Sequence, residues 1–125
     1  MAWKRSTRPP GWYPRRGEVC LFDLDKERPA VVISTDPLNR FSRDVCVVPV
    51  SKVEHKQFSL RPKLEAGEGG LDYSSWVKCD QVTTLDKDAA VYPALGFLTQ
   101  GSLAKIEAAI RIAAIRIALE LPERK

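Results

Sequence analysis

The sequence predicts a mainly β domain of the α+β class that carries a long C-terminal helix. Short runs of β-branched and apolar residues recur along the chain, turn-forming residues separate them, and a helical apolar repeat follows residue 99. With 125 residues, 44% of them hydrophobic, the chain is long enough for one domain with its own core and too short for two. This composition excludes a disordered or fibrous protein.

The first two expected strands form a β-hairpin. Residues 18–24 and 29–34 are apolar runs joined by a short polar connection, which is typical of that motif. Residues 35–40 are turn formers, and residues 44–50 form a third strand in which Pro49, having no N–H, is expected at a sheet edge or strand end. The later expected features are a short strand at 57–60, a flexible turn at 66–70, two strands within 75–85 broken at Asp80 and Gln81, and a strand at 95–98.

The helix is expected to begin with Thr99 or Ser102 as its cap and to end at Pro122. Its apolar residues form two stripes. The first stripe is Leu103, Ile106, Ile110, Ala113 and Ile117, and the second is Ala108, Ile112, Ile115 and Leu119. A surface helix of a small domain needs one apolar face, so the second stripe predicts a homodimer. The alternative is a helix sunk deeply into its own domain.

The positive charge lies mostly in an N-terminal arm, residues 1–15, which precedes a domain at 16–121 and a tail at 122–125. The formal net charge is +4, yet the first 17 residues hold five basic side chains and no acid, and the rest holds 15 basic and 16 acidic ones. Trp3, Trp12 and Tyr13 alternate with those cations. Such an arm either stacks on bases and follows the backbone of a single-stranded nucleic acid, or packs its rings on the domain.

The sequence favours a cytoplasmic protein without a metal or other cofactor. The basic N-terminus lacks the apolar segment of a signal peptide, and arginines interrupt the most apolar stretch, so no membrane span is expected. Cys20, Cys46 and Cys79 are widely spaced, and His55 is the single histidine, which argues against zinc and for buried thiols in a reducing compartment.

Two residues are candidates for chemistry. Arg28 precedes Pro29 and is therefore held extended, where its planar guanidinium suits phosphate oxygens; the alternative is a surface arginine paired with Asp25 or Glu27. Ser51 places a hydroxyl at the end of the third strand and is by itself a turn residue. His55 lies in a charged segment typical of an exposed loop.

Five ordered blocks of this sequence resemble the MazF/PemK family of toxin endoribonucleases. The blocks are residues 16–19, 28–34, 39–41, 47–51 and 79–87, and an apolar helix follows them. The resemblance spans residue 16 to about 121. It implies an SH3-like small barrel with added helices, a homodimer that forms the RNA groove, and a cognate antitoxin that occupies the groove. It also implies cleavage of single-stranded RNA at short sequence motifs without a metal.

The resemblance also implies site residues. Arg28 matches the family's catalytic arginine, and Ser51 stands where the family has a catalytic threonine. Asp80 and Gln81 match a pair that lies near RNA, and Asn39, Arg40 and Lys52 complete the expected RNA-binding set. The expected reaction is attack of the 2′-OH on the phosphorus, which gives a 2′,3′-cyclic phosphate and a 5′-hydroxyl, with Arg28 stabilising charge and Ser51 donating a hydrogen bond.

The sequence departs from this family between the first two strands. Family members carry a longer loop there, which helps to hold RNA, whereas here only Asp25, Lys26 and Glu27 separate Leu24 from Arg28. Either the basic arm substitutes for this loop, or activity and sequence choice are altered, or the protein is a catalytically inactive relative that binds RNA or protein, which is the alternative function. A DNA-binding barrel is a third possibility, although it has no need of Arg28 beside a hydroxyl.

Overall fold

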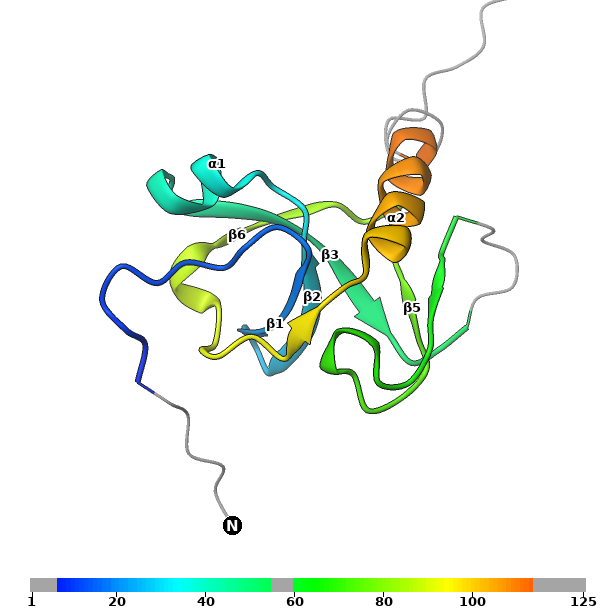
Figure 1. The fold of residues 1–125 in the computed structure, drawn as a ribbon, viewed down its shortest axis with the longest axis horizontal. Coiled ribbons are helices and arrows are strands. Elements are labelled where there is room, and N and C mark those ends of the chain that lie inside the picture. Colours follow the sequence, from blue (N-terminus) through cyan, green and yellow to red (C-terminus); the bar gives the residue numbers. More distant parts are fainter. Residues whose placement is uncertain (1–6, 55–59, 114–125) are drawn as a thin grey trace, which may run out of the picture.

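A strongly curled antiparallel sheet forms the body of the protein, and a helix rises from one end of it (Figure 1). The computed structural model describes residues 7–54 and 60–113. The sheet order is β4-β5-β3-β2-β1-β7, and β6 pairs with β3. The elements are β1 (Glu18–Asp23), β2 (Glu27–Val32), α1 (Asp36–Phe41), β3 (Asp44–Ser51), β4 (Lys63–Leu64), η1 (Glu68–Gly70), β5 (Ser75–Val77), β6 (Thr83–Asp86), η2 (Lys87–Ala89), β7 (Gly96–Phe97) and α2 (Gln100–Ala113).

The predicted mainly β class, the hairpin and the break at Asp80 and Gln81 are confirmed. The turn predicted for residues 35–40 is wrong, because these residues form α1. Thr35 is extended and Pro37 lies in the first turn, where a missing N–H costs no helical hydrogen bond. Asp36 in the same turn favours the helix by its charge. The same turn-forming residues therefore also start a helix.

Pro49 lies inside β3 rather than at the predicted edge or strand end. On one side, β3 pairs first with β6, through Asp44 to Val47, and then with β5, through Val50 and Ser51. The carbonyl of Pro49 accepts the N–H of Lys78 at 2.9 Å, so its nitrogen faces the same side, between the two partner strands. The missing N–H thus falls where the ladder changes partner.

Apolar side chains fill both faces of the curled sheet, as the alternation along each strand requires. One cluster contains Cys20, Phe22, Ala30, Val32, Val45, Val47 and Ala90. The other contains Val19, Val31, Val48, Leu64, Leu71, Val77, Cys79, Leu98, Ile106 and Ala109. The second cluster includes the inner face of α2, which fixes the helix against the sheet.

Helix α2 begins as predicted, with Thr99 before its first turn. The Thr99 hydroxyl accepts the N–H of Ser102 at 3.2 Å, which is an N-cap. Ala108 and Ile112 of the second stripe are exposed in this single chain. Ile115, Ile117, Leu119 and Pro122, and most of the strand expected at 57–60, lie outside the described residues. No helix within the described ranges is long and apolar enough to cross a membrane.

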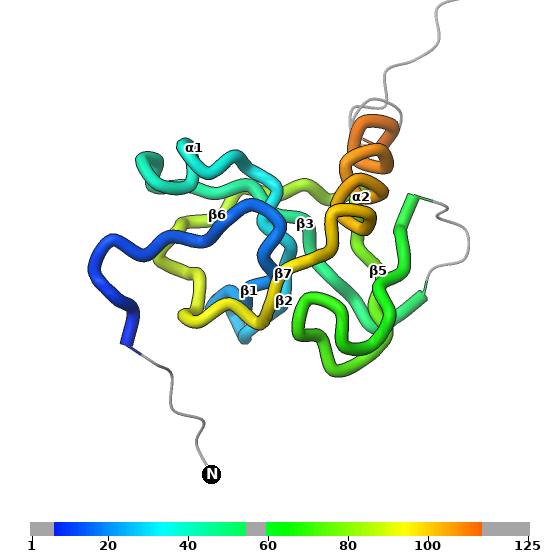
Figure 2. The backbone as a smooth tube through the Cα atoms, in the orientation of Figure 1, coloured from blue at the N-terminus to red at the C-terminus, as the bar shows by residue number. Residues whose placement is uncertain are grey.

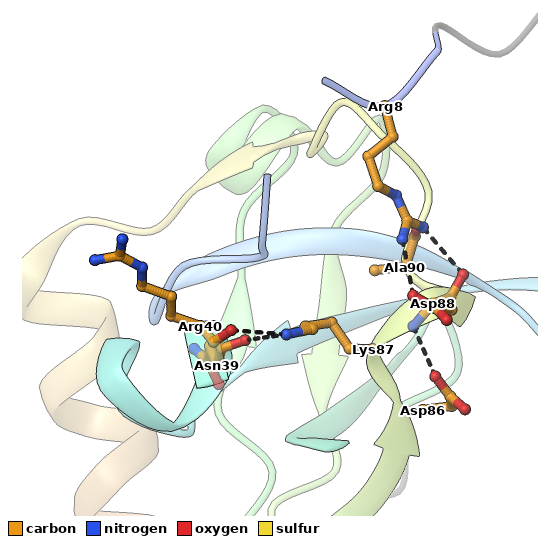
Figure 3. Close-up of polar contacts among 7 residues, drawn as sticks. All are labelled: Arg8, Asn39, Arg40, Asp86, Lys87, Asp88 and Ala90. Carbon is orange, nitrogen blue, oxygen red and sulfur yellow. Dashed lines mark hydrogen bonds and ion pairs between the residues drawn. The ribbon is translucent and has the colours of Figure 1, made fainter. Parts of the chain in front are cut away.

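The described part of the N-terminal arm packs along the segment that follows β6 (Figure 2). The rings of Trp12 and Tyr92 meet edge to face with centroids 5.2 Å apart, and Pro14 is fully buried. The Arg8 guanidinium lies 5.4 Å from the Trp12 ring centroid and donates to the carbonyl oxygens of Asp88 and Ala90 (Figure 3). Trp12 therefore packs on the domain, which was the second alternative for the arm, while Trp3 lies outside the described residues.

A buried ion pair links the two ends of the hairpin formed by β4 and β5. Arg61 precedes β4 and Asp80 follows β5, and the two side chains form two parallel hydrogen bonds of 2.9 Å. Only 6% of the Arg61 side chain and 11% of the Asp80 side chain are exposed. The hydrogen bond from Arg61 lowers the pKa of Asp80 below its ordinary value, outweighing the effect of burial. Asp80 is therefore ionised at neutral pH.

Gly70 is expected to tolerate alanine much less well than Gly67. Both glycines have positive φ, so each alanine variant should lose about 1–2 kcal/mol of unfolding free energy. A Cβ at Gly70 would lie 2.0 Å from the Leu95 carbonyl oxygen, whereas one at Gly67 would meet nothing within 4 Å. Urea denaturation should therefore show a larger loss for Gly70→Ala. Equal losses would contradict this packing.

Asp80→Asn is expected to lower the unfolding free energy at pH 7 by about 3–5 kcal/mol, because it leaves the buried Arg61 charge without its partner. Since folding lowers the pKa of Asp80, its contribution is complete above the unfolded-state pKa, about 3.9, and is lost as the pH falls through the folded value. Urea denaturation from pH 7 to pH 2 should show a weaker acid dependence for Asp80→Asn than for the wild type. Asp44→Asn, which removes an exposed carboxylate, is the control, and an equal effect of both variants would refute the role of the pair.

Candidate functional site

Arg28 lies near the start of β2, with 49% of its side chain exposed. Its guanidinium donates two hydrogen bonds to the Asp25 carboxylate, from Nε at 3.2 Å and from Nη2 at 3.1 Å. The bond lowers the pKa of Asp25 and raises the pKa of Arg28, so both stay charged near neutrality. Asp25 comes from the three-residue connection between β1 and β2 and holds the guanidinium in one orientation.

The Ser51 hydroxyl ends β3 and accepts the N–H of Val53 at 3.0 Å. The ladder between β2 and β3 has Ala30 opposite Pro49 as its last pair. Continued by two residues on each strand, this register places Arg28 opposite Ser51. Residues that face each other across neighbouring strands project from the same side of the sheet. The fold therefore brings the two predicted catalytic residues to one face, at adjoining strand ends.

A pocket of about 270 Å³ opens next to Ser51 and Lys52. Leu21, Pro29 and Val50 provide apolar walls, and Tyr73 lies at the pocket with 60% of its surface exposed. The Lys52 ammonium is 4.2 Å from the centroid of the Tyr73 ring, a cation–π contact. Lys52 thus places a positive charge beside the strand end that carries Ser51.

Asn39 and Arg40 lie at the opposite end of β3, in α1 (Figure 3). Asn39 is fully buried, where its amide donates to the Ser34 carbonyl and its side-chain oxygen accepts the Ser34 hydroxyl. The Arg40 guanidinium stacks over Phe41, and the Lys87 ammonium binds the carbonyl oxygens of Asn39 and Arg40. Because β3 spans eight residues, or roughly 25 Å, these two residues are remote from Ser51 within one chain.

Asp80 and Gln81 follow β5 and differ in what they offer a ligand. The Asp80 carboxylate is occupied by Arg61, so its described role is structural. Gln81 is exposed, and its backbone N–H donates to the Lys78 carbonyl at 2.9 Å. Of the predicted RNA-binding residues, Lys52 lies beside Ser51, whereas Asn39 and Asp80 are held by internal hydrogen bonds.

The sequence-based prediction did not include Arg61, although its position before a proline resembles that of Arg28. It precedes Pro62 at the start of a strand, just as Arg28 precedes Pro29. What no local pattern shows is its partner, because 19 residues separate Arg61 from Asp80. The two arginine–proline pairs therefore look alike in sequence, and only the fold separates the exposed guanidinium from the buried one.

The described residues do not support catalysis by a cysteine thiol or by a bound metal ion. Burial raises the pKa of Cys20 and of Cys79 to about 12, so neither thiol is a nucleophile at neutral pH. Within residues 7–54 and 60–113, no three His, Cys, Asp or Glu side chains are grouped to hold a metal ion. His55 lies outside these ranges.

Comparison with known proteins identifies the family of the chain. The model of a family described as the PemK-like, MazF-like toxin of type II toxin-antitoxin systems matches residues 15–114. No protein of curated function matches the chain. An endoribonuclease from a mycobacterial species, solved in complex with its cognate antitoxin, is 27% identical with a TM-score of 0.69, over 89% of this chain and 99% of that one.

Two further solved structures are similar. A second endoribonuclease structure from a mycobacterial species is 26% identical with a TM-score of 0.67, over 89% of this chain and 95% of that one. A MazE–MazF structure from Deinococcus radiodurans shares the fold at 22% identity with a TM-score of 0.69, over 79% of this chain and 93% of that one. Since the family model spans most of the chain and these folds agree with it, the protein belongs to the PemK-like, MazF-like toxin family of type II toxin–antitoxin systems.

Proposed function

We propose that this protein is an endoribonuclease toxin that cleaves single-stranded RNA at short sequence motifs without a metal ion. The observation that supports the proposal is the register of β2 and β3, which brings Arg28 opposite Ser51 when it is continued beyond its last pair, Ala30 and Pro49, in a chain whose family is established. Two solved structures of similar fold, at 26% and 27% identity, are named endoribonucleases. An exposed arginine beside a strand-end hydroxyl is a geometry that suits a phosphodiester.

The reaction uses the nucleophile that RNA itself carries. The 2′-oxygen forms a bond to phosphorus as its proton leaves, the bond from phosphorus to the 5′-oxygen breaks, and that oxygen takes up a proton. The products are a 2′,3′-cyclic phosphate and a 5′-hydroxyl. Arg28 stabilises the charge that develops on the phosphoryl oxygens, and the Ser51 hydroxyl donates to one of them.

The Asp25 contact is compatible with this role for Arg28. A guanidinium has five N–H donors, and Asp25 engages Nε and Nη2 alone, so the Nη1 edge can meet phosphate. Asp25 raises the pKa of Arg28, so the guanidinium is charged when it meets the phosphate, and the family resemblance suggests that it also helps to move protons. Asp25 is therefore a positioning residue for Arg28.

The partners of the protein are an antitoxin and a second copy of the chain. The mycobacterial neighbour is solved with its cognate antitoxin, and the Deinococcus neighbour is a MazE–MazF structure. The second apolar stripe of α2 leaves Ala108 and Ile112 exposed in one chain, which supports a homodimer through this helix. A cytoplasmic location follows from an RNA substrate.

A non-cleaving module that binds RNA or protein is the second candidate. The short connection between β1 and β2 favours it, because Asp23 already faces Glu27 across the hairpin and no long loop is left to hold RNA. The same connection supplies Asp25, whose negative charge lies against Arg28 and offsets its attraction for phosphate. The assay below separates the two candidates.

Arg28→Ala and Ser51→Ala are each expected to slow RNA cleavage in EDTA by about 100- to 1000-fold, the effect of losing one positioned donor. Ser51→Thr keeps the hydroxyl and should retain activity, and Arg28→Lys should fall between the wild type and Arg28→Ala because it loses the planar fork. The measurements are the rate at which a mixed-sequence RNA is cleaved and the chemical nature of the product ends. Circular dichroism checks that each variant is folded. If the wild type binds RNA but never cleaves it, the module is correct and the toxin activity is wrong.

Ile112→Glu is expected to convert a dimer into a monomer, because it places a charge in the apolar stripe on the outer face of α2. Light scattering after gel filtration should give twice the 14.0 kDa chain mass for the wild type and that mass once for the variant. Gln100→Glu, an exposed change at the start of the same helix, should remain dimeric. A monomeric wild type would refute the proposed interface.

A further inference from the structure

A row of four side chains of different chemistry crosses one end of the sheet. Ser51 of β3 is opposite Trp76 of β5, and Trp76 is opposite Lys63 of β4. Arg28 of β2 continues the row beyond Ser51 by the register described above. The order is therefore an ammonium, an indole, a hydroxyl and a guanidinium, each on the strand next to the last.

The row lies on the face of the sheet opposite α2, and its four side chains are exposed or half-buried. The neighbours of Trp76 and Ser51 along their strands, Val77 and Val50, pack in the core cluster that includes α2. Since side chains alternate between the faces of a strand, Trp76 and Ser51 project from the opposite face. Trp76 is half-buried, so its ring is supported by the sheet while part of it meets solvent.

The indole of Trp76 already makes a cation–π contact with Lys63. The Lys63 ammonium is 5.7 Å from the centroid of the Trp76 ring and 3.7 Å from the Glu65 carboxylate, with 47% of the Lys63 side chain exposed. Both contacts are long and partly exposed, so each contributes little and can yield to a ligand. Lys63 can then meet a phosphate while the ring face becomes free for a base.

We propose that Trp76 is a stacking platform for a nucleobase of the RNA substrate and that Lys63 binds the adjoining phosphate. The proposal rests on the proposed function and adds a base-binding subsite to it. Neighbouring strands lie about 4.8 Å apart, so a nucleotide with its phosphate at Ser51 can reach Trp76 with its base. An aromatic face beside a cation is how proteins hold single-stranded nucleic acid without reading its sequence.

The occupant follows from the charge pattern of the row. Two cations, Arg28 and Lys63, flank the hydroxyl and the ring, which matches a chain in which phosphates alternate with flat bases. A protein partner would find one half-buried ring in this row, with no apolar neighbour beside it in either register pair. A single strand of RNA fits both features.

The first test uses the fluorescence of Trp76 itself. The sequence has three tryptophans, so Trp3→Phe with Trp12→Phe leaves Trp76 alone, and Ser51→Ala prevents cleavage during the titration. Short single-stranded RNA of mixed sequence should quench the emission. RNA of the same length with abasic sites should quench it much less, because it offers phosphates without bases. Equal quenching by both probes would refute stacking.

The second test compares variants of the ring in the otherwise native chain. Trp76→Leu should raise KM and weaken RNA binding about 5- to 150-fold, the range for loss of one stacked base, and should change kcat little. Trp76→Phe should restore most of the binding, which a merely structural loss of volume would not explain. Phe97→Leu removes a ring with 77% exposure in β7, at the opposite edge of the sheet from β4, and should change nothing.

Lys63→Gln should weaken binding of all RNA sequences alike and lower the salt dependence by about one phosphate contact. If Trp76→Leu binds and cleaves like the wild type while Arg28→Ala is inactive, the subsite is wrong and the endoribonuclease function stands. If the wild type neither binds nor cleaves any RNA, both proposals fail. If Trp76 emission follows protein concentration and ignores RNA, the row is a protein interface and the subsite is wrong.

Discussion

The rest of the structure depends on the hydrogen-bond ladders of β3. This one strand pairs with β2 on one side and with β6 and then β5 on the other, so it connects every part of the sheet. Pro49, which has no N–H, lies where the partner changes from β6 to β5. After this change of partner, the last two residues of β3 pair with β5, Val50 with Val77 and Ser51 with Trp76.

The two arginine–proline pairs show how burial decides what one residue type does. Arg28 and Arg61 each open a strand and each bind an aspartate through two parallel hydrogen bonds. The Arg61 pair is almost completely buried. Breaking it would leave a charge without a partner in the interior, so the role of this pair is structural. The Arg28 pair is half exposed and therefore exchanges readily with solvent and ligands. The same arginine–aspartate contact thus stabilises the fold where it is buried and leaves the arginine accessible to a ligand where it is exposed.

Local patterns predicted most elements, although the turn expected at 35–40 is the helix α1. Two apolar runs with a short polar connection predicted the hairpin of β1 and β2, and the spacing of apolar residues predicted α2 and its Thr99 cap. Sequence-based prediction failed where distant partners decide: Asn39 is held by Ser34, and Asp80 by Arg61, in contacts that no motif announces. Arg28 and Ser51 were candidates from the sequence and received their expected catalytic roles from the family resemblance, whereas their common face follows from the register of β2 and β3, which only the fold provides. Trp76 carried no signal at all until β5 was paired.

The three-residue connection between β1 and β2 also sets the thermodynamic character of binding at this edge. Asp23 and Glu27 close the hairpin directly, so little chain is left there to become ordered. A ligand that meets a preformed edge loses little conformational entropy on the protein side, and recognition approaches rigid docking. For the RNA substrate or the antitoxin proposed above, conformational adaptation at this hairpin would therefore fall mainly to the partner.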